Sequence, residues 1–514
     1  MTALLIKSLQ NPALYPHTVD SFKLIETHIS WVLLTGSYAY KIKKPVDLGF
    51  LDFSSLAQRE HYCREELRLN SRLAPNIYLE VIAISGKATQ PQLEGMGVAI
   101  EYAVKMRQFP PDNTFDHLLL AGLLDGVHIQ QTAIIIADFH AQLPSANANT
   151  LFGHPASILL PVQENFSQIE QLANIDKPSI LHSLKRWSAQ QHAKLRSIFT
   201  QRKQAGFIRE CHGDLHLGNL ALIEDRVVPF DGIEFNPALY WIDGISEVAF
   251  LVMDLQSKQR HDLAYQFLNT YFWQTGDYSG LKLLRFYLVY RSMVRAKVEA
   301  IRAHQNASEE ERQQALSRYH NYLQLAQSYT QLEPPMLIIM QGVSGSGKSW
   351  LAEQIINRYQ IISLRSDVER KRLHKQYVIS DEQYSAENRN KIYQHLLTIA
   401  KDILQAKYSV LIDATFLAQQ QRAIFLQLAE QCKASFIIIH TQADQATLLQ
   451  RIDQRSLQAD NVSDATQAVL DNQQSSQQAL SANELQYSIA VNTAKAGDLD
   501  KLWRFIDSVW QRGQ

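Results

Sequence analysis

The residues best suited to chemistry lie in a glycine-rich segment that follows a short apolar run. Residues 342–349 read Gly-Val-Ser-Gly-Ser-Gly-Lys-Ser and fit the pattern G-x-x-x-x-G-K-[ST]. Its glycines let successive backbone N–H groups converge on phosphate oxygens, and the helix expected after it adds its positive end. An ordinary glycine turn is disfavoured because a strand is expected before it and a helix after it. The nucleotide-binding residues that this pattern predicts are Gly342, Gly345, Ser346, Gly347, Lys348 and Ser349, with Lys348 on the β- and γ-phosphates and Ser349 on Mg²⁺.

Acidic residues follow two further expected strands in the same region. Asp367 comes after the apolar run 361–362, where it would accept the proton of an attacking hydroxyl; the alternative is a helix N-cap. Asp413 ends the run Val410-Leu-Ile-Asp and is predicted to ligate Mg²⁺, with a turn aspartate as the alternative. Arg451 and Arg455 share a helix face, as a lid over the transferred phosphoryl group or as solvated charges.

Residues 335–514 resemble the small-molecule and polynucleotide kinase branch of P-loop proteins, which includes zeta-toxin-like kinases. The resemblance rests on the phosphate loop, on Ser-Asp-x-x-Arg at 366–370 and on Ile-Asp-Ala-Thr at 412–415. It implies that Asp367 is the catalytic base, Arg370 a substrate anchor and Arg455 a lid residue. Substrates in this branch range from sugars to nucleic-acid ends, so the resemblance names none.

A second set of polar residues lies in the first half of the chain. Residues 212–219 read His-Gly-Asp-Leu-His-Leu-Gly-Asn, and Asp231-Gly232 follows an expected hairpin. In kinases one carboxylate orients the hydroxyl nucleophile, while an amide and a second carboxylate hold Mg²⁺ on the nucleotide phosphates. The spacing of Asp214, Asn219 and Asp231 suits that chemistry. The alternatives are a zinc site on His212 and His216 and a purely structural loop.

An upstream lysine and glutamate complete the pattern of a kinase nucleotide site. Lys41 follows an expected strand and turn, where kinases place a phosphate-binding lysine, and the next helix offers glutamates to pair with it. Lys41 and Glu66 are the preferred pair, with Lys43, Glu60 and Glu65 as the alternatives. The chain has no GxGxxG loop and no Ala-Pro-Glu segment. Protein substrates are therefore less expected.

This arrangement resembles the aminoglycoside phosphotransferase superfamily, whose loop reads His-Gly-Asp-x-His-x-x-Asn. More fully, the chain resembles a bacterial group that fuses such a domain to a P-loop ATP-binding domain. The resemblance implies that Asp214 is the catalytic base, that Asn219 and Asp231 are Mg²⁺ ligands, and that His212 braces the loop. It gives Asp243 an anchoring role.

The expected helix Leu281–His304 argues against a polycationic acceptor. If it lined the acceptor cleft it would favour an anionic substrate; the alternative is a solvated basic face. Its basic residues are Arg285, Arg291, Arg295, Lys297 and Arg302.

The predicted fold class is an α+β, two-lobed protein-kinase-like domain followed by an α/β P-loop domain with a mainly parallel sheet. We expect an N-lobe over 1–110, a helical C-lobe with the catalytic loop over 111–305, and the P-loop domain over 335–514. The segment 306–334 is expected to be a helical linker, with a long solvated helix over 307–331.

Composition supports a soluble chain of several domains. It has 514 residues, 46% of them hydrophobic, so it can bury a full core. Lys and Arg total 50 against 51 for Asp and Glu, which disfavours binding to nucleic acid through bulk charge. The three cysteines, Cys63, Cys211 and Cys432, are far apart, and no long apolar segment is seen. These features predict a cytoplasmic protein without a disulfide framework.

The sequence therefore predicts a phosphotransferase that uses ATP and Mg²⁺ at two nucleotide sites. Its acceptor would be the hydroxyl of a small molecule. Two alternatives stay open: an ATP-sensing regulator in which one or both sites do not transfer, and a kinase acting on nucleic-acid ends. The last would need a basic groove, for which the candidate residues are Arg365, Arg370, Lys371 and Arg372.

Overall fold

The computed structural model describes residues 2–47, 49, 51–173, 175–305, 308–376, 386–456, 466–495 and 497–513, a few of them at segment ends by backbone alone. The chain divides into two compact units: residues 1–168 with 189–254, and residues 169–188 with 255–514. Among the described residues, no helix is both long enough and apolar enough to cross a membrane.

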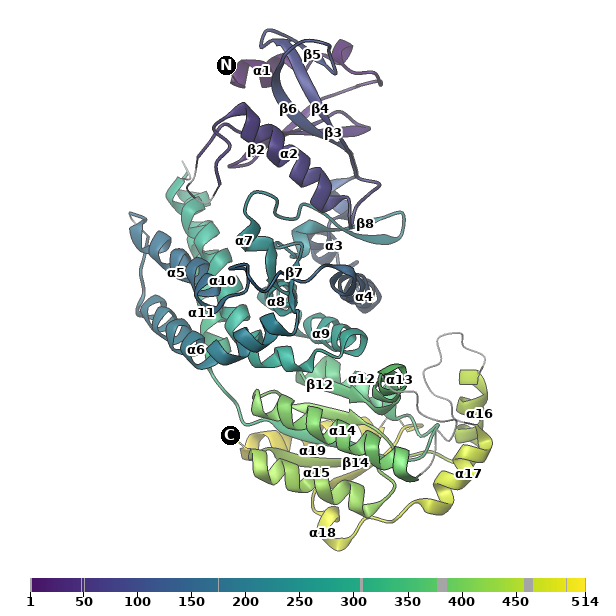
Figure 1. The fold of residues 1–514 in the computed structure, drawn as a ribbon. Helices are drawn as coiled ribbons and strands as arrows, with labels where there is room; N and C mark the ends of the chain where they lie inside the picture. Colours follow the sequence, from purple (N-terminus) through teal and green to yellow (C-terminus); the bar gives the residue numbers. More distant parts are fainter. Residues whose placement is uncertain are drawn as a thin grey trace. The chain divides into compact units, whose positions relative to one another are not determined.

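Unit 1 begins with a six-stranded antiparallel sheet whose two faces bury different elements (Figure 1). On one face, Leu5 and Ile6 of α1 (Thr2–Ser8) pack with Ile42 and Ala103. On the other, Cys63 packs with Val104. Since side chains alternate along a strand, Lys41 and Lys43 must share the face opposite Ile42. In spatial order the strands are β1 (Lys23–Glu26), β2 (Ser30–Leu34), β3 (Tyr38–Lys43), β6 (Ala99–Arg107), β4 (Tyr78–Lys87) and β5 (Gln90–Leu93).

The lysine-bearing face is covered by helix α2 (Leu56–Asn70), which also supplies the predicted glutamates. Ser55 caps this helix: its hydroxyl accepts from the Gln58 amide while the Gln58 side chain returns to the Ser55 amide. This capping box fixes where the helix begins. It thereby fixes which helix residues face the sheet.

The rest of unit 1 is mainly helical and carries two short antiparallel strand pairs. The strand β7 (Ile208–Glu210) pairs with β10 (Trp241–Asp243), and β8 (Leu220–Ile223) pairs with β9 (Arg226–Pro229). The predicted catalytic loop lies between β7 and β8, and Asp231 follows β9. The helices are α3 (Phe115–Leu120), α4 (Gly126–Gln142), α7 (Pro237–Tyr240) and most of α8 (Gly244–Ser257), with parts of α5 (Pro155–Gln171) and α6 (Ser179–Gln204).

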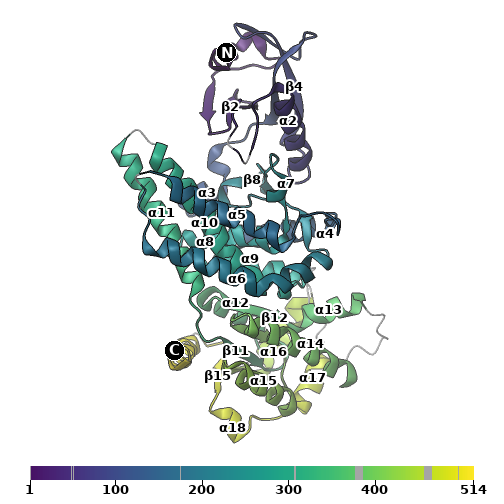
Figure 2. The ribbon, with the colours of Figure 1, turned by 60° about the vertical axis from the view of Figure 1, so that its left-hand side comes forward.

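Unit 2 contains a five-stranded parallel sheet in the spatial order β12-β13-β11-β14-β15. Met336, Ile338 and Met340 of the central strand β11 pack against α12 and α19. Leu337 and Ile339, equally buried, face the opposite side, where α14 and α15 pack on the sheet (Figure 2). The strands are β11 (Met336–Gln341), β12 (Ile362–Arg365), β13 (Val410–Asp413), β14 (Ser435–Gln442) and β15 (Ser488–Asn492).

The helices of this domain follow the order expected for a parallel sheet with crossover connections. They are α12 (Lys348–Tyr359), α13 (Ser366–Gln376), α14 (Ala386–Gln405), α15 (Gln419–Cys432), α16 (Gln445–Ser456), α17 (Gln467–Ser476), α18 (Ala482–Leu485) and α19 (Gly497–Gly513). The predicted fold class, a kinase-like α+β region followed by an α/β P-loop domain, is confirmed.

Three helices of unit 2 precede the P-loop domain in sequence: α9 (His261–Thr275), α10 (Leu281–Gln305) and α11 (Glu309–Thr330). Helix α11 forms where a helix was expected, but the expectation that it is solvated is wrong. It packs along α10 and buries Ala315, Tyr319, Tyr322 and Ala326. These residues recur at helical spacing, yet Ala and Tyr among many Gln and Glu residues give a weak hydrophobic signal.

Replacing Tyr319 tests this packing. Tyr319→Ala should lower the free energy of unfolding by about 3–5 kcal/mol, because it empties a fully buried ring site. Tyr319→Phe should cost only about 1 kcal/mol, since it removes just the hydroxyl that donates to the Asp176 carbonyl. Denaturant unfolding followed by circular dichroism measures both, with the exposed Gln314→Ala as control. If Tyr319→Ala and Gln314→Ala lowered the free energy of unfolding equally, the packing of α11 through Tyr319 would be contradicted.

Candidate active sites

The first site is built around Glu66, a carboxylate with no solvent exposure. Lys41 Nζ lies 2.7 Å from Glu66 Oε1, and Lys43 Nζ lies 2.7 Å from Glu66 Oε2. Burial alone would raise the pKa of Glu66, but the two ammonium groups outweigh it and lower the pKa to about 2. Glu66 therefore joins both predicted lysines to helix α2.

The two lysines differ in what else they contact. The side chain of Lys43 is 1% exposed and also pairs with the buried Glu234, so it is shielded from the solvent. Lys41 reaches forward to Asp231 Oδ1 at 2.5 Å. Burial would lower the pKa of Lys41, but Asp231 and Glu66 outweigh it and raise the pKa well above its ordinary value. Both lysines thus pair with Glu66, but Lys41 also contacts the half-exposed Asp231, whereas Lys43 pairs with the buried Glu234.

The turn that carries Asp231 is held by α2 and β4. The Asp231 amide donates to the Tyr78 hydroxyl at 3.0 Å, and the Gly232 amide donates to Asn70 Oδ1 at 2.7 Å. Asp231 has φ +59°, so its side chain leaves the backbone in a direction that an extended residue would not give. Its carboxylate is 45% exposed and faces both Lys41 and the solvent.

Asp214 and Asn219 meet across the loop between β7 and β8. Asn219 Nδ2 donates to Asp214 Oδ2 and to the Asp214 carbonyl, both at 3.0 Å, and reaches the Asp231 carbonyl at 3.3 Å. These bonds occupy the amide nitrogen of Asn219, so its oxygen Oδ1 is the group it presents as a metal ligand. Asp214, Asn219 and Asp231 are therefore gathered in one place.

The zinc alternative on His212 and His216 has no support in this geometry. The Phe230 carbonyl can only accept, so His212 Nε2 carries the proton and donates to it at 2.9 Å. His212 Nδ1 then accepts from the Asp214 amide at 3.3 Å. Both nitrogens of His212 are thus used in bracing the loop.

Two acidic residues of α8 hold the same loop, and the sequence did not single them out as loop anchors. Glu247 Oε2 accepts from the Gly213 amide at 2.7 Å, while its Oε1 pairs with His140 Nε2 at 2.9 Å. Asp254 Oδ2 accepts from the Leu217 amide at 2.9 Å. Glu247 ends a Trp-x-Asp-x-x-x-Glu run that starts at Trp241 and also contains Asp243.

Asp243, in the same run, has the anchoring environment expected of it. It is buried and receives two hydrogen bonds from Arg202, at 2.6 and 2.8 Å. Among the described residues, His140, Cys211 and Glu247 are close enough to share a metal ion. Because Glu247 binds both His140 and the Gly213 amide, the closeness of these residues is explained by their role in holding the loop.

The second site is the phosphate loop between β11 and α12. Gly345 has φ +80° and Gly347 has φ +86°. A Cβ at Gly345 would meet the Leu448 carbonyl at 2.8 Å, and one at Gly347 would meet Thr493 Oγ1 at 2.7 Å. Both positions thus require glycine for conformation and for space.

Side chains from outside the loop orient its carbonyl groups. Arg451 Nη1 donates to the Gly345 carbonyl at 3.2 Å and to Thr493 Oγ1 at 2.8 Å; Thr493 in turn donates to the Ser346 carbonyl at 3.0 Å. Because a trans peptide points its N–H opposite to its C=O, the Gly347 amide faces away from Thr493. Arg451 thus contacts the phosphate loop itself.

Ser349 and Asp413 supply oxygen atoms at one point. Ser349 Oγ donates to Asp413 Oδ2 at 2.7 Å, and Lys348 Nζ donates to the carbonyls of Gly342 and Val343 at 3.0 and 2.8 Å. A hydroxyl and a carboxylate are ligands that suit Mg²⁺. At the first site, three carboxylates (Glu66, Asp231 and Glu234) face two ammonium groups, and this excess negative charge also suits a divalent cation.

Asp367 and Arg370 pair on the first turns of α13, with Arg370 Nη2 3.0 Å from Asp367 Oδ1. Burial raises the pKa of Asp367 above its ordinary value and the nearby Asp413 adds to this, while Arg370 opposes it. A raised carboxyl pKa suits a base that must take up a proton. The side chain of Arg455, the predicted lid residue, lies outside the described residues.

Several predicted candidates lie elsewhere. Glu60 pairs with Arg64 and Glu65 with Arg68, along the outer side of α2. The basic residues of α10 have contacts within unit 2: Arg285 donates to the Lys407 carbonyl at 2.7 Å, Arg302 pairs with Glu299, and Arg291 and Arg295 lie over the rings of Tyr290 and Tyr322.

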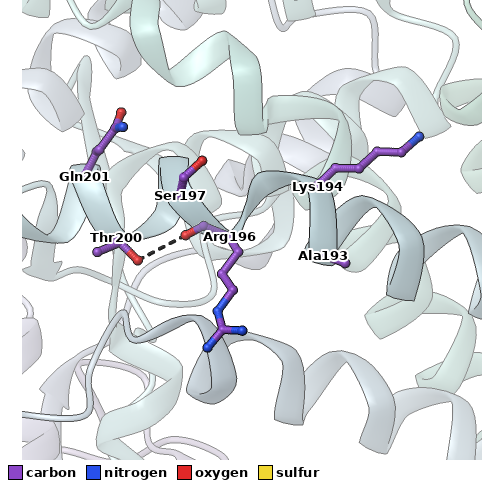
Figure 3. A pocket seen from close by; sticks show the side chains of 6 residues that line it. All are labelled: Ala193, Lys194, Arg196, Ser197, Thr200 and Gln201. Carbon is purple, nitrogen blue, oxygen red and sulfur yellow. Dashed lines mark hydrogen bonds between the residues drawn. The ribbon is translucent and has the colours of Figure 1, made fainter.

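A surface depression on α6 contains none of the predicted site residues (Figure 3). Residues of this one helix line it: Ala193, Lys194, Arg196, Ser197, Thr200 and Gln201. The Thr200 hydroxyl donates to the Arg196 carbonyl, as a side chain commonly does within a helix.

Comparison with known proteins supports the division of the chain. Residues 337–480 match the family model described as "AAA domain", AAA_33. Uncharacterized proteins of Mycobacterium tuberculosis and Mycobacterium bovis are 29% identical to the chain over 461 residues, covering 88% of this chain and 89% of the relative. Neither half of the chain is that long, so the alignment includes both. The chain joins an α+β region with an antiparallel sheet to a P-loop domain with a parallel sheet.

Two solved structures are similar to parts of the chain. A choline/ethanolamine kinase family protein from Mesorhizobium loti is 12% identical, covers 63% of this chain and 94% of its own, and gives a TM-score of 0.41. A sugar kinase from Janibacter sp. is 17% identical, covers 34% of this chain and 95% of its own, and gives a TM-score of 0.28.

The different contacts of Lys41 and Lys43 predict opposite effects of substituting them on stability and on MgATP binding. Lys43→Met should lower the free energy of unfolding by about 3–5 kcal/mol, because Glu234 and one oxygen of Glu66 stay buried without their cation. Lys41→Met should cost much less stability, since Glu66 keeps Lys43, but should weaken MgATP binding. Denaturant unfolding and titration with a fluorescent ATP analogue measure the two effects. The reverse ranking would place Lys43 at the nucleotide.

Proposed function

We propose that the protein is an ATP- and Mg²⁺-dependent phosphotransferase with two nucleotide sites, each transferring a γ-phosphoryl group to a hydroxyl of a small molecule. The observation that carries this proposal is the chain of contacts Glu66–Lys41–Asp231 beside the Asp214–Asn219 pair. It brings residues from three separate parts of the sequence to one place, each with the chemistry that its predicted role requires.

At the first site, Lys41 binds nucleotide phosphate oxygens and Glu66 holds its ammonium group in position. Asp214 orients the acceptor hydroxyl and takes its proton as the oxygen attacks the γ-phosphorus; the bond from that phosphorus to the β,γ-bridging oxygen breaks, and ADP leaves. Asn219 Oδ1 and the Asp231 carboxylate would hold Mg²⁺, which neutralises charge on the phosphates when bound. His212 and Glu247 keep the loop in place by binding its backbone.

At the second site, the backbone amides of the phosphate loop and Lys348 bind the phosphates, and Ser349 with Asp413 would hold the cation. Asp367 is the proposed base and Arg370 the proposed anchor of the acceptor. No residue of the protein becomes covalently modified in this scheme. Catalysis at both sites rests on positioning and on charge stabilisation.

Transfer of labelled γ-phosphate from MgATP into a cell extract tests both sites. Asp214→Asn and Lys348→Ala should each reduce one set of labelled products by at least about 10²-fold, because each removes a group that acts in the transition state. Separation of the extract into metabolites, RNA and protein identifies the class of acceptor. The matched controls are the exposed Asp225→Asn and Lys495→Ala.

Distinct products lost with each variant would make the protein a two-reaction enzyme. Label in the RNA fraction would replace the small-molecule acceptor with nucleic-acid ends. If the wild type binds MgATP yet labels no fraction of the extract, the phosphotransferase proposal fails in favour of an ATP sensor.

The pH dependence of the second site follows from the raised pKa of Asp367. The base acts only as a carboxylate, so transfer that depends on Lys348 should fall as the pH drops through the pKa of Asp367 in the folded protein. Since burial raises that pKa, the fall should begin at a higher pH than an ordinary aspartate gives. A rate profile between about pH 4 and pH 8 measures this. Asp367→Asn should remove most of the transfer rate, and also the fall of that rate at low pH. The exposed Asp471→Asn should leave the rate and its pH dependence unchanged.

A further inference from the structure

Strand β12 lies at the edge of the parallel sheet, and helix α9 binds its outward-facing backbone. The Ile362 amide bonds inward to Ser409, so residues 361 and 363 present their polar groups to the outer side. Asn269 takes two of these groups: its Nδ2 donates to the Ile361 carbonyl at 2.9 Å, and its Oδ1 accepts from the Ser363 amide at 2.7 Å. Asn269 is 1% exposed. It therefore binds the strand edge as a neighbouring strand would.

Trp273, one helical turn further along α9, completes the contact. Its Nε1 donates to the Ser363 carbonyl at 3.0 Å. Its ring lies under the guanidinium of Arg365, 5.1 Å from the ring centroid. Arg365 is the last residue of β12, next to α13. Trp273 thus contacts the strand at the end that leads into the proposed acceptor site.

The end of α9 also binds α13 directly. Arg372 Nη2 donates to the carbonyls of Phe272 and Trp273, at 3.2 and 2.7 Å. The Phe272 carbonyl also accepts from the Gly276 amide at 2.8 Å. The carbonyls at the end of a helix attract cations, so Arg372 binds α9 at an end that favours its charge. Gly276 leaves room for it, because a Cβ there would meet Arg372 Nε at 2.8 Å.

Helix α13 carries the proposed base and anchor on one side and is bound by neighbouring residues on the other. Asp367 and Arg370 are three residues apart and share one side, which carries the proposed base and anchor. Glu369 and Arg372 are also three apart but begin two positions later, and two residues turn a helix by about 200°. Glu369 is buried and binds Arg372 and His395. One side of α13 is held by its neighbours while the other carries the site.

We propose that α9 is a positioning element of the P-loop site. Asn269 and Trp273 fix β12, and Arg372 fixes α13, so that Asp367 and Arg370 keep the place that phosphoryl transfer requires. These three are positioning residues, since they act through the strand and helix that carry the site. The inference rests on the proposed function of Asp367. It goes further by making the P-loop site dependent on a helix outside the P-loop domain.

Hydrogen–deuterium exchange and transfer, measured on the full chain, test the proposal together. In Asn269→Ala, exchange in residues 361–372 should rise about 10-fold or more, because the Ser363 amide loses its acceptor. Transfer that depends on Lys348 should fall by about 10-fold or more, as expected from a small displacement of a catalytic group. The KM for MgATP and the exchange of residues 342–349 should stay unchanged.

Conservative and matched variants separate positioning from general damage. Trp273→Phe keeps a ring under Arg365 and should lose less transfer than Trp273→Leu, which also removes the ring. Gln266→Ala is the control: it lies on α9 and removes an exposed hydrogen bond to Asn357 at 2.7 Å, away from β12 and α13. It should behave as the wild type does.

Three results would overturn the proposal. They are unchanged exchange in 361–372, wild-type transfer despite faster exchange, or loss of MgATP binding together with transfer, which would mean that α9 only supports folding. If the wild type forms no product that depends on Lys348, the proposed function fails instead. Hydrogen–deuterium exchange in residues 366–372 is then the sole test of the positioning role of α9. Faster exchange in Asn269→Ala would support that role, and unchanged exchange would contradict it.

Discussion

A fully buried carboxylate that must be neutralised determines how unit 1 is arranged. Glu66 has no solvent exposure, so the desolvation of its charge must be offset by cations within hydrogen-bonding distance. Lys41 and Lys43 meet this need because alternation along β3 gives both the same face of the sheet. The positive charge of the two lysines that Glu66 does not neutralise then attracts Asp231 and Glu234, which are three residues apart in the segment after β9. The sheet, helix α2 and the segment that carries Asp231 are therefore held together by one charge network.

The second site is organised by backbone groups more than by charge. The phosphate loop depends on glycines where a Cβ would collide, and on Arg451 and Thr493, which fix the direction of its carbonyls. The proposed acceptor side depends on an edge strand whose outward-facing groups are bound by side chains of α9. In both places the side chains proposed to bind substrates stand on backbone that other side chains hold in place. Such support is what keeps a catalytic geometry within a fraction of an ångström.

Much of this arrangement could be predicted because its signals are local. The phosphate loop, the Asp214–Asn219 spacing and the strand that carries Lys41 each lie within a short stretch of sequence. The supporting residues could not be predicted in the same way, because Glu234, Tyr78, Asn70 and Asn269 act through contacts between distant segments. The different partners of Lys41 and Lys43 could not be predicted either, since both lysines face the same helix. The burial of helix α11 could not be predicted, because its buried Tyr and Ala residues give only a weak hydrophobic signal among many Gln and Glu residues.

The binding of β12 by α9 also bears on how this domain avoids misassembly. An edge strand with unpaired backbone groups is a template for pairing with another chain, and proteins commonly block such edges. Here the blocking groups are Asn269 and Trp273, which precede the start of the P-loop domain at Pro335 by some sixty residues. A fragment cut at that point would keep its phosphate loop but expose an apolar strand, with Ile361, Ile362 and Leu364 fully buried in the intact chain. Self-association through that edge is the physical cost of separating the P-loop domain from α9.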